Sequence, residues 1–231
     1  MNGDGYADLL VGDGAGNLAY IYHGGPQGPE DAPATTLSGE GLYGTSVDIA
    51  GDVNGDGYAD IVVGAPEASK IHVYLGGPDG VKKINEIPLF GGASQGISVS
   101  SAGDVNADGR MDIVTGSVYV ARIYLGDPGT GVSQTPIELL GTSKAFADSV
   151  AGVGDTDGNG YDDVLVGATD QDNASLYLGS PDGFPTLASK TIYADGDAPG
   201  YGYSVAGLWS SEKTNNLWNR SQAPPQLRIQ L

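Results

Sequence analysis

The sequence contains no cysteine, only two histidines, and ten lysines and arginines together among 231 residues. The absence of cysteine excludes disulfide bonds, thiol catalysis and thiolate metal sites. The few basic residues face 29 acidic ones, and the formal net charge of −19 argues against binding to nucleic acids or anionic membrane surfaces. Long apolar runs are also missing, and the first residues are polar and glycine-rich. We therefore expect neither membrane insertion nor a signal peptide in this chain.

Glycine is abundant instead, with 39 residues, accompanied by 13 prolines and 13 tyrosines. This composition favours many short strands joined by tight turns, and it makes long helices unexpected. Because acidic residues are so strongly in excess, cations are the favoured small partners.

An acidic segment of the form D-x-[DN]-x-[DN]-G-x-x-D occurs three times, beginning at Asp52, Asp104 and Asp155. The intervals between these starts are 52 and 51 residues. Residues 2–8 repeat the same pattern 52 residues earlier and lack only its first Asp. The sequence therefore predicts a unit of about fifty residues that is repeated four times.

The flanks of the acidic segments repeat in register as well. A short β-branched run follows each segment, and these runs are predicted to be strands buried on both faces, at residues 9–12, 61–64, 113–116 and 164–167. A further strand such as 71–75 ends in a Gly-Gly-Pro-Asp-Gly turn. With one strand before the acidic loop and a variable outer strand such as 84–90, each unit has four strands. This pattern predicts an all-β fold, a β-propeller of four-stranded blades.

The pairs Tyr43-Gly44 and Gly64-Ala65-Pro66 on either side of the acidic loop resemble the FG and GAP elements of the FG-GAP repeat found in integrin α-subunit propellers. The resemblance covers residues 1–207, although Gln95 replaces the aromatic residue of the third unit and Gly116-Ser117-Val118 replaces Gly-Ala-Pro. It implies units at about 1–43, 44–95, 96–146 and 147–200, with a partial unit at 201–207. Integrin-like propellers typically have seven blades, so the resemblance implies about four blades of a larger propeller.

The two ends of the chain depart from the repeat. Because the chain begins inside the first acidic loop, we expect it to be a piece of a larger protein. Residues 208–231 contain neither Gly nor Asp and are expected to be a disordered or foreign tail. Two arrangements stay open: an open fragment, or one completed by another chain, as the resemblance implies, and a small ring in which residues 201–207 complete the first blade.

The acidic loops have the chemistry of a calcium site. Ca²⁺ takes six to eight oxygen ligands, and such a loop offers side-chain oxygens at positions 1, 3, 5 and 9, a backbone carbonyl at position 7 and a flexible Gly at position 6. The predicted ligands of the three complete loops are Asp52, Asn54, Asp56, the Tyr58 carbonyl and Asp60; Asp104, Asn106, Asp108, the Arg110 carbonyl and Asp112; and Asp155, Asp157, Asn159, the Tyr161 carbonyl and Asp163. An incomplete fourth site would use Asn2, Asp4, the Tyr6 carbonyl and Asp8.

Other interpretations of these loops are weaker. Asp, Asn and Gly populate ordinary turns, but three full matches in phase argue against turns without a ligand. An EF-hand needs flanking helices and a Glu at position 12, where this chain has Val63, Thr115 or Val166. Mg²⁺ demands strict octahedral geometry and retains its waters, which favours calcium.

No enzymatic site is expected. His23 and His72 fall at repeat positions that other units fill with ordinary strand residues, and Asp162, beside the predicted ligand Asp163, has no counterpart in the other units. The recurring tyrosines at 22, 74, 124 and 177 indicate blade packing rather than a sugar-stacking platform. We find no nucleophile elbow, phosphate loop or zinc-type histidine pair.

Three functions of different classes remain. The first is a calcium-binding module for extracellular protein interaction or cell adhesion, with protein or matrix ligands. The second is a lectin-like carbohydrate binder, and the third is the non-catalytic part of a secreted polysaccharide-active enzyme. An extracellular or cell-surface location follows from the calcium chemistry, because such modules need only about 10⁻⁴ to 10⁻³ M affinity. The ligand is not identified by the sequence, because fold does not determine function.

Overall fold

The structure, a computed structural model, describes residues 1–88, 98–195 and 199–207. Four antiparallel sheets follow one another along the chain. The first has three strands, β1 (Leu9–Asp13), β2 (Leu18–Tyr22) and β3 (Thr35–Ser38). The second has four, β4 (Val47–Gly51), β5 (Asp60–Ala65), β6 (Lys70–Leu75) and β7 (Lys82–Pro88).

The third and fourth sheets repeat this order. The third contains β8 (Ser98–Gly103), β9 (Asp112–Ser117), β10 (Val120–Tyr124) and β13 (Ile137–Leu140), with a small hairpin of β11 (Gly126–Asp127) and β12 (Gly131–Val132) inserted before its last strand. The fourth contains β14 (Phe146–Gly154), β15 (Asp163–Ala168), β16 (Asn173–Tyr177) and β17 (Lys190–Tyr193). One short 3₁₀ turn, η1 (Thr169–Gln171), joins β15 to β16. The prediction of an all-β fold built from four-stranded propeller blades is confirmed.

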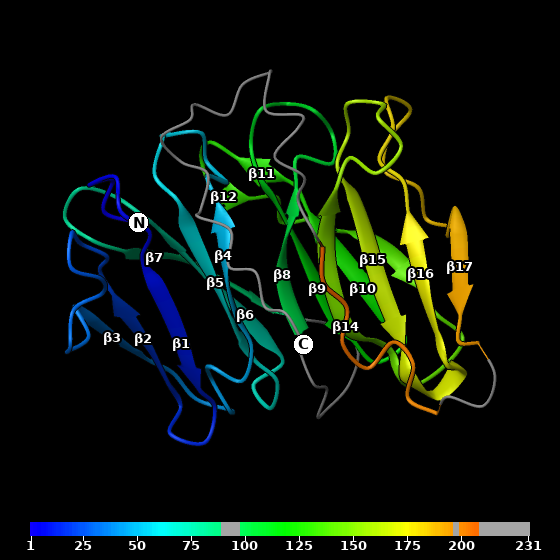
Figure 1. Cartoon of the computed structure of the whole chain (residues 1–231), viewed down its shortest axis with the longest axis horizontal. Helices are drawn as coiled ribbons and strands as arrows, with labels where there is room; N and C mark the ends of the chain where they lie inside the picture. Colours follow the sequence, from blue (N-terminus) through cyan, green and yellow to red (C-terminus); the bar gives the residue numbers. More distant parts are fainter. Residues whose placement is uncertain (89–97, 196–198, 208–231) are drawn as a thin grey trace.

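The blades stand side by side, with the first and the fourth at opposite ends of the molecule (Figure 1). In the three complete blades, the acidic loop connects the first strand to the second. These loops therefore lie at one common end of the strands, at the top of Figure 1. The outer strand predicted near residues 84–90 is β7, and its residues 89 and 90 lie outside the described part of the chain.

Burial of the second strands matches the prediction in three blades. All six residues of β5 and of β9 are buried, as are five of the six in β15. The prediction was wrong for β1, where Leu9 and Val11 are each 47% exposed. In the described residues β1 pairs only with β2, so no inner strand or preceding blade covers it. Burial of this strand is a property of its neighbours rather than of its own sequence.

Successive blades approach each other closely at small residues. A Cβ built on Gly12 of the first blade would lie 2.1 Å from the Gly44 carbonyl oxygen, and one on Gly116 would lie 2.0 Å from that of Ala147. The same contact joins Gly167 to the Gly202 carbonyl oxygen, at 2.0 Å. The glycine near the end of β1, β9 and β15 thus receives the backbone of the next unit, which explains why glycine recurs there.

Residues 199–207 continue this pattern on the fourth blade. The Val205 amide donates to the Ser149 hydroxyl at 3.0 Å, as the Val150 amide donates to Ser98 at 3.2 Å. Within the described residues, the segment 199–207 belongs to no strand and the free edge of β1 is not paired with it. Among the described residues the arrangement is therefore open, and residues 199–207 do not complete the first blade.

The part of the chain that the structure describes contains no helix long and apolar enough to cross a membrane.

Candidate metal-binding loops

In each complete loop, the carboxylate of the first Asp accepts hydrogen bonds from backbone amides of the same loop. Asp52 accepts hydrogen bonds from the amides of Gly55, Asp56 and Gly57, at 2.7, 3.0 and 2.7 Å. Asp104 and Asp155 accept from their own loop amides in the same way. The glycine at position 6 adopts a positive φ, 91° at Gly57, as the sequence predicts for this sharp bend. The position-1 carboxylate thus organises the loop backbone as an Asx-type turn does.

The last Asp of each loop ties the loop to the rest of its blade. Asp60 is fully buried and accepts from the Val53 amide at 2.9 Å and from the Gly76 amide at 2.8 Å. Equivalent bonds join Asp112 to the amides of residues 105 and 126, Asp163 to those of residues 156 and 179, and Asp8 to that of residue 24. Each glycine partner lies one or two residues after the end of β2, β6, β10 or β16. The sequence identified these aspartates only as ligands, and their second role in holding this segment was missed.

Burial and neighbouring negative charges disfavour the ionised form of Asp60 and Asp112. Burial raises the pKa of Asp60 to about 7, and the neighbouring carboxylates of Asp52 and Asp56 add to the effect, against the opposing backbone hydrogen bonds. Burial likewise raises the pKa of Asp112 to about 7, with the charges of Asp104 and Asp108 adding. The hydrogen bonds to these carboxylates therefore do not offset the effects of burial and of the neighbouring negative charges. A bound cation would stabilise the ionised carboxylates.

The fourth loop brings three predicted ligands together. One carboxylate oxygen each of Asp155, Asp157 and Asp163 lie within 4.8 Å of one another. In the second and third loops an Asn replaces Asp157, and its amide donates to the position-5 carboxylate, from Asn54 to Asp56 at 2.9 Å and from Asn106 to Asp108 at 2.9 Å. Among the described residues, the fourth loop alone gathers three acidic ligands.

The predicted ligands of the incomplete first loop show the same local bonds. The Asn2 amide donates to Asp4 at 2.9 Å, and the Tyr6 backbone amide donates to Asp4 at 2.9 Å. Hydrogen bonds from Tyr6 and Asn2 hold the pKa of this exposed Asp4 carboxyl below its usual range. Residues 2–8 therefore keep the geometry of the later loops without a position-1 carboxylate.

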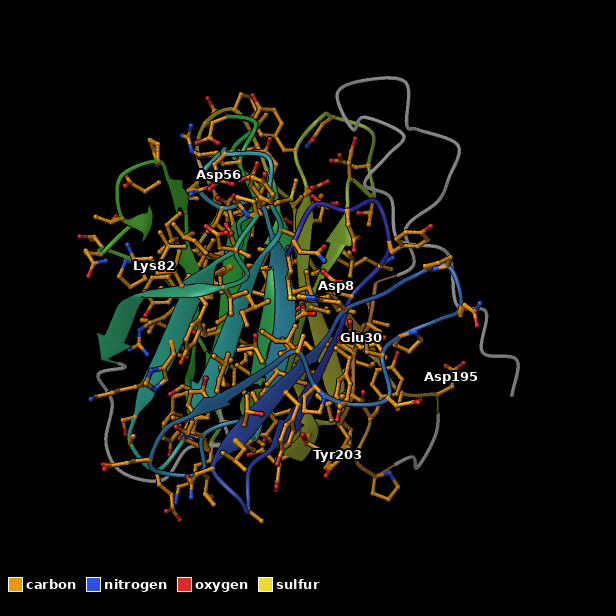
Figure 2. All side chains as sticks on the ribbon, turned by 90° about the vertical axis from the view of Figure 1, so that its left-hand side faces the viewer. Asp8, Glu30, Asp56, Lys82, Asp195 and Tyr203 are labelled. Carbon is orange, nitrogen blue, oxygen red and sulfur yellow. The ribbon has the colours of Figure 1, made fainter. Side chains whose placement is uncertain are left out.

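The donor set of the complete loops fits a hard divalent cation. Each loop offers carboxylate and amide oxygens from alternate residues, together with a glycine bend, and oxygen is the ligand that Ca²⁺ takes. The side chain of Asp56 lies at the loop end of the molecule, far from Tyr203 at the other end (Figure 2). A cation held there would cross-link residues that are eight positions apart, such as Asp155 and Asp163, and so close the loop.

The loops of neighbouring blades are also linked to each other. The Met111 amide donates to the Asp52 carbonyl at 2.9 Å, and the Asp162 amide donates to the Asp104 carbonyl at 3.1 Å. The Asp162 carboxylate, in turn, accepts from the Asp104 amide at 2.8 Å. Burial raises the pKa of Asp162 to about 6, and nearby Asp104 adds to this. Asp162 therefore connects two acidic loops, a role that its lack of counterparts in other units concealed.

One of the two histidines considered for catalysis lies in a packing environment. His72 is buried on β6, with its ring 5.0 Å from that of Tyr43 in an edge-on arrangement. The Tyr43 hydroxyl donates to the Tyr74 hydroxyl at 2.8 Å, and Tyr124 and Tyr177 are buried at the equivalent position. These three recurring tyrosines are blade-packing residues, as predicted, and each belongs to a core cluster that it shares with the preceding blade.

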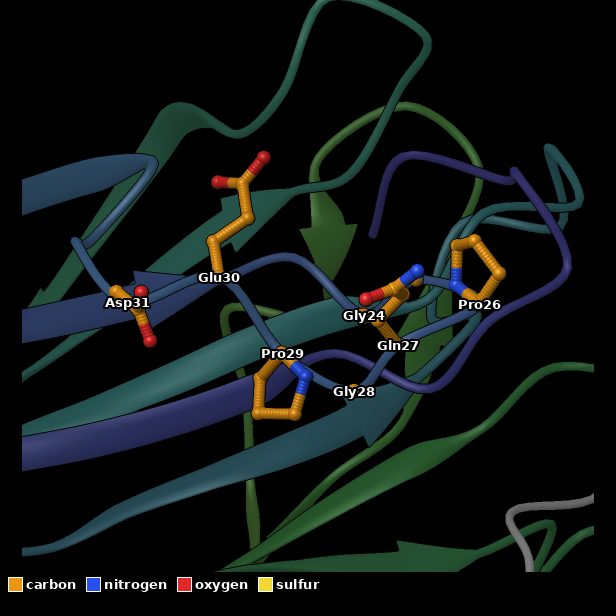
Figure 3. A pocket seen from close by; sticks show the side chains of 8 residues that line it. Gly24, Pro26, Gln27, Gly28, Pro29, Glu30 and Asp31 are labelled. Atoms are coloured by element: carbon orange, nitrogen blue, oxygen red, sulfur yellow. The ribbon is translucent and has the colours of Figure 1, made fainter.

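Two hollows lie outside the acidic loops. One, of about 520 Å³, is formed by residues 24–31 in the loop between β2 and β3. Its acidic side chains, Glu30 and Asp31, project in different directions, so they do not converge on a ligand (Figure 3). The other, of about 480 Å³, lies on the fourth blade beside β16 and β17.

Comparison with known proteins agrees with the repeat pattern. The family described as the FG-GAP-like repeat matches residues 1–63, 52–115 and 104–166. Integrin alpha-5 of Xenopus laevis is 33% identical over 210 residues, which cover 77% of this chain and 20% of that protein. Integrin alpha-6 of Homo sapiens is 34% identical over 64% of this chain and 14% of its own length, and integrin alpha-PS5 of Drosophila melanogaster is 32% identical over 60% and 16%. The chain thus spans a fifth or less of these relatives.

Proposed function

The chain belongs to the FG-GAP repeat family, and from that premise we propose that it is a calcium-stabilised β-propeller module for extracellular protein interaction or cell adhesion. The metal is structural in this proposal, and the module carries out no catalysis. The observation that carries the calcium assignment is the convergence of the Asp155, Asp157 and Asp163 carboxylates within 4.8 Å. The second and third loops share its spacing and hydrogen bonding, which extends the assignment to three ions.

Each proposed site uses the five groups predicted for its loop. The position-9 Asp would serve both the ion and the turn glycine, so binding would reinforce the contact between the loop and the third strand. The incomplete loop at residues 2–8 lacks one carboxylate and is proposed to bind Ca²⁺ more weakly than the complete loops do. Extracellular calcium sites need only about 10⁻⁴ to 10⁻³ M affinity, which supports a location outside the cytoplasm.

Protein binding is supported by the relatives and by one strained surface. The relatives named above are integrin alpha subunits. At the end of the blades opposite the acidic loops, Tyr119 is 43% exposed and adopts a φ of 66°. The equivalent hairpins place Asn17, Ser69 and Asp172 in this left-handed conformation. A bulky residue there costs roughly 1–2 kcal/mol, and strain of this kind is typical of binding surfaces.

Calorimetric titration with Ca²⁺, paired with thermal melting in chelator and in millimolar Ca²⁺, tests the proposal. We expect about three ions per chain and a calcium-dependent rise in melting temperature, because a ligand that binds only the folded state stabilises it. Asp56→Ala and Asp108→Ala should each remove one ion, since each removes one carboxylate from one loop.

The matched control is Asp79→Ala, which removes an exposed acidic side chain from a turn outside the predicted loops. It should leave the number of bound ions unchanged. Absence of heat and of any thermal shift in the unmodified protein would refute the calcium assignment.

A further inference from the structure

The hollow on the fourth blade is an open groove of about 480 Å³. Its walls come from β16, from β17, from residues 186–188, from residues 140–142 at the end of β13 and from Phe146 at the start of β14. Phe146 and Tyr177 are buried at its base, whereas Leu140, Leu187 and Tyr193 are 71, 81 and 68% exposed. This gathers three of the most exposed large apolar side chains of the described residues around one depression.

The groove exists because the fourth blade carries small side chains where its sister blades carry large ones. Ser175 lies opposite Val166 in the sheet, in the register position that Arg122 holds opposite Thr115. On its other side Ser175 lies opposite Thr191, whereas Arg122 lies opposite Glu138. The second blade has His72 at the same position, opposite Val63.

In the second and third blades, the side chains of His72 and Arg122 fill the corresponding space. Arg122 is buried, and its Nε donates to the Glu138 Oε1 at 2.9 Å. In the second blade, the His72 ring packs edge-on against Tyr43 at 5.0 Å. Phe146 is the counterpart of Tyr43 in the fourth blade, but Ser175 and Thr191 are too short to reach across the same space. The vacated volume is the groove.

The chemistry of the groove differs from that of the rest of the molecule. The whole chain has a formal net charge of −19, yet none of the residues lining the groove is charged. A charged group entering it would meet hydroxyl and aromatic side chains and no counter-ion, which carries a desolvation penalty. An apolar or aromatic side chain would meet Phe146 and Tyr177, and the hydroxyls of Ser175 and Thr191 can accept or donate a hydrogen bond.

One side of the groove is also the outermost strand of its sheet. In the described residues β17 pairs only with β16, so its other edge is not used by a further strand. Thr191 and Tyr193 alternate along β17 on the side that lines the groove. An extended peptide lying along this edge would gain backbone hydrogen bonds from the strand and place alternate side chains towards the groove.

We propose that this groove is a docking site for an extended segment of a partner protein that inserts an uncharged apolar or aromatic side chain between Tyr177, Leu187 and Tyr193. The proposal rests on the protein-interaction function proposed above and identifies a surface for it. Uncharged lining and the overall negative charge together disfavour acidic partners, and they favour a segment without Asp or Glu.

A double variant that copies the third blade tests the site. Ser175→Arg with Thr191→Glu recreates the pair formed by Arg122 and Glu138 and should fill the groove in a folded blade. The matched control, Gln27→Arg with Thr36→Glu, adds the same two charges at exposed positions of the first blade. Both variants are compared with the unmodified protein by thermal melting in calcium, to establish that they are folded.

Peptides are then selected on the unmodified chain from a phage-displayed library of random linear sequences, in calcium, and their affinities are measured by fluorescence anisotropy. We expect the selected peptides to be apolar or aromatic and to lack acidic residues. They should bind the double variant at least on the order of tenfold more weakly and bind the control unchanged. If the filled double variant unfolds, Tyr193→Ser, which removes one exposed wall, provides the second test with the same expectation.

Three results would overturn the docking site: no enrichment of peptides, selection of acidic sequences, or equal affinity for the folded variants and the unmodified protein. These results are separate from failure of the calcium assignment, which appears in the titration of the unmodified chain alone. A chain that binds calcium but selects no peptide would contradict the groove and leave the metal sites intact.

Discussion

The hydroxyl of Ser100 on β8 donates a hydrogen bond of 2.9 Å to the carboxylate of Asp48 on β4, across the boundary between the second and third blades. The same carboxylate oxygen accepts from the Ser101 amide at 2.9 Å. Burial nevertheless raises the pKa of Asp48 above its ordinary value, against these hydrogen bonds. A partly buried acid between two blades makes their contact sensitive to pH.

We predict that Asp48→Asn flattens part of the pH dependence of stability. An acid whose pKa is raised by folding stabilises the native state below its unfolded pKa, about 3.9, and loses that contribution as pH rises through the folded pKa. From pH 4 to pH 7 the unmodified protein should therefore lose unfolding free energy relative to the variant. Urea unfolding at fixed calcium across this range measures the difference, and parallel curves would contradict the prediction.

A second prediction separates the two roles of the loop aspartates. Asp163 accepts from the amides of Thr156 and Gly179 besides being a proposed ligand, whereas the exposed Asp157, among the described residues, accepts hydrogen bonds only from Asn159. In Asp163→Asn, the side-chain NH₂ group would face one of these two backbone N–H donors and could not accept its hydrogen bond. The free energy of unfolding should therefore fall by about 1–3 kcal/mol even in chelator.

Asp157→Asn is the matched comparison, because it removes a charge from the same loop without removing a buried acceptor. It should melt as the unmodified protein does in chelator and lose part of the calcium-dependent rise. Thermal melts of both variants in chelator and in calcium make the comparison. Equal melting temperatures for the two variants in chelator would show that Asp163 acts as a ligand alone.

The repeat and the strands that follow the acidic loops could be predicted because their signals are local. Asp52, Gly57 and Asp60 lie within nine residues, and the β-branched run of β5 follows at once. The bond between Asp60 and the Gly76 amide spans sixteen residues and depends on how two strands pair, so the loop pattern alone does not reveal it. The exposure of Leu9 depends on which blade stands beside β1, which its own sequence does not encode.

The groove was missed for a related reason. A vacant space depends on the summed volumes of side chains from several strands, here Ser175, Thr191 and Phe146. A signal was nonetheless present, because aligning the repeats sets Ser175 against Arg122 and His72. Repeat positions at which one unit has a much smaller residue than its sisters are places to expect a cavity.

The close contact between blades gives a third prediction. A Cβ on Gly116 would lie 2.0 Å from the Ala147 carbonyl oxygen, so Gly116→Ala forces the third and fourth blades apart. We expect the free energy of unfolding to fall by about 1–3 kcal/mol, the usual cost of overpacking. Gly77→Ala is the control, because its nearest atom, the Gly80 carbonyl oxygen, is 3.6 Å from the new Cβ. Chemical denaturation of both proteins checks the prediction, which fails if the two substitutions have the same effect.

The fourth prediction concerns the serines that join successive blades. The hydroxyls of Ser46, Ser98 and Ser149 accept hydrogen bonds from the amides of Val99, Val150 and Val205, at 3.0, 3.2 and 3.0 Å. Replacing any one serine with alanine leaves a single amide without its acceptor, which costs about 1–3 kcal/mol where that amide is buried.

Amide hydrogen exchange followed by NMR can resolve the three boundaries separately. Ser98→Ala should accelerate exchange at Val150 more than at Val99, and Ser46→Ala should do the reverse, because each serine serves only the blade that follows it. The unchanged amide in each variant is the internal control for global destabilisation. Uniform acceleration at both valines would mean that the blades open together, and the hydrogen bonds would then contribute to overall stability rather than to individual boundaries.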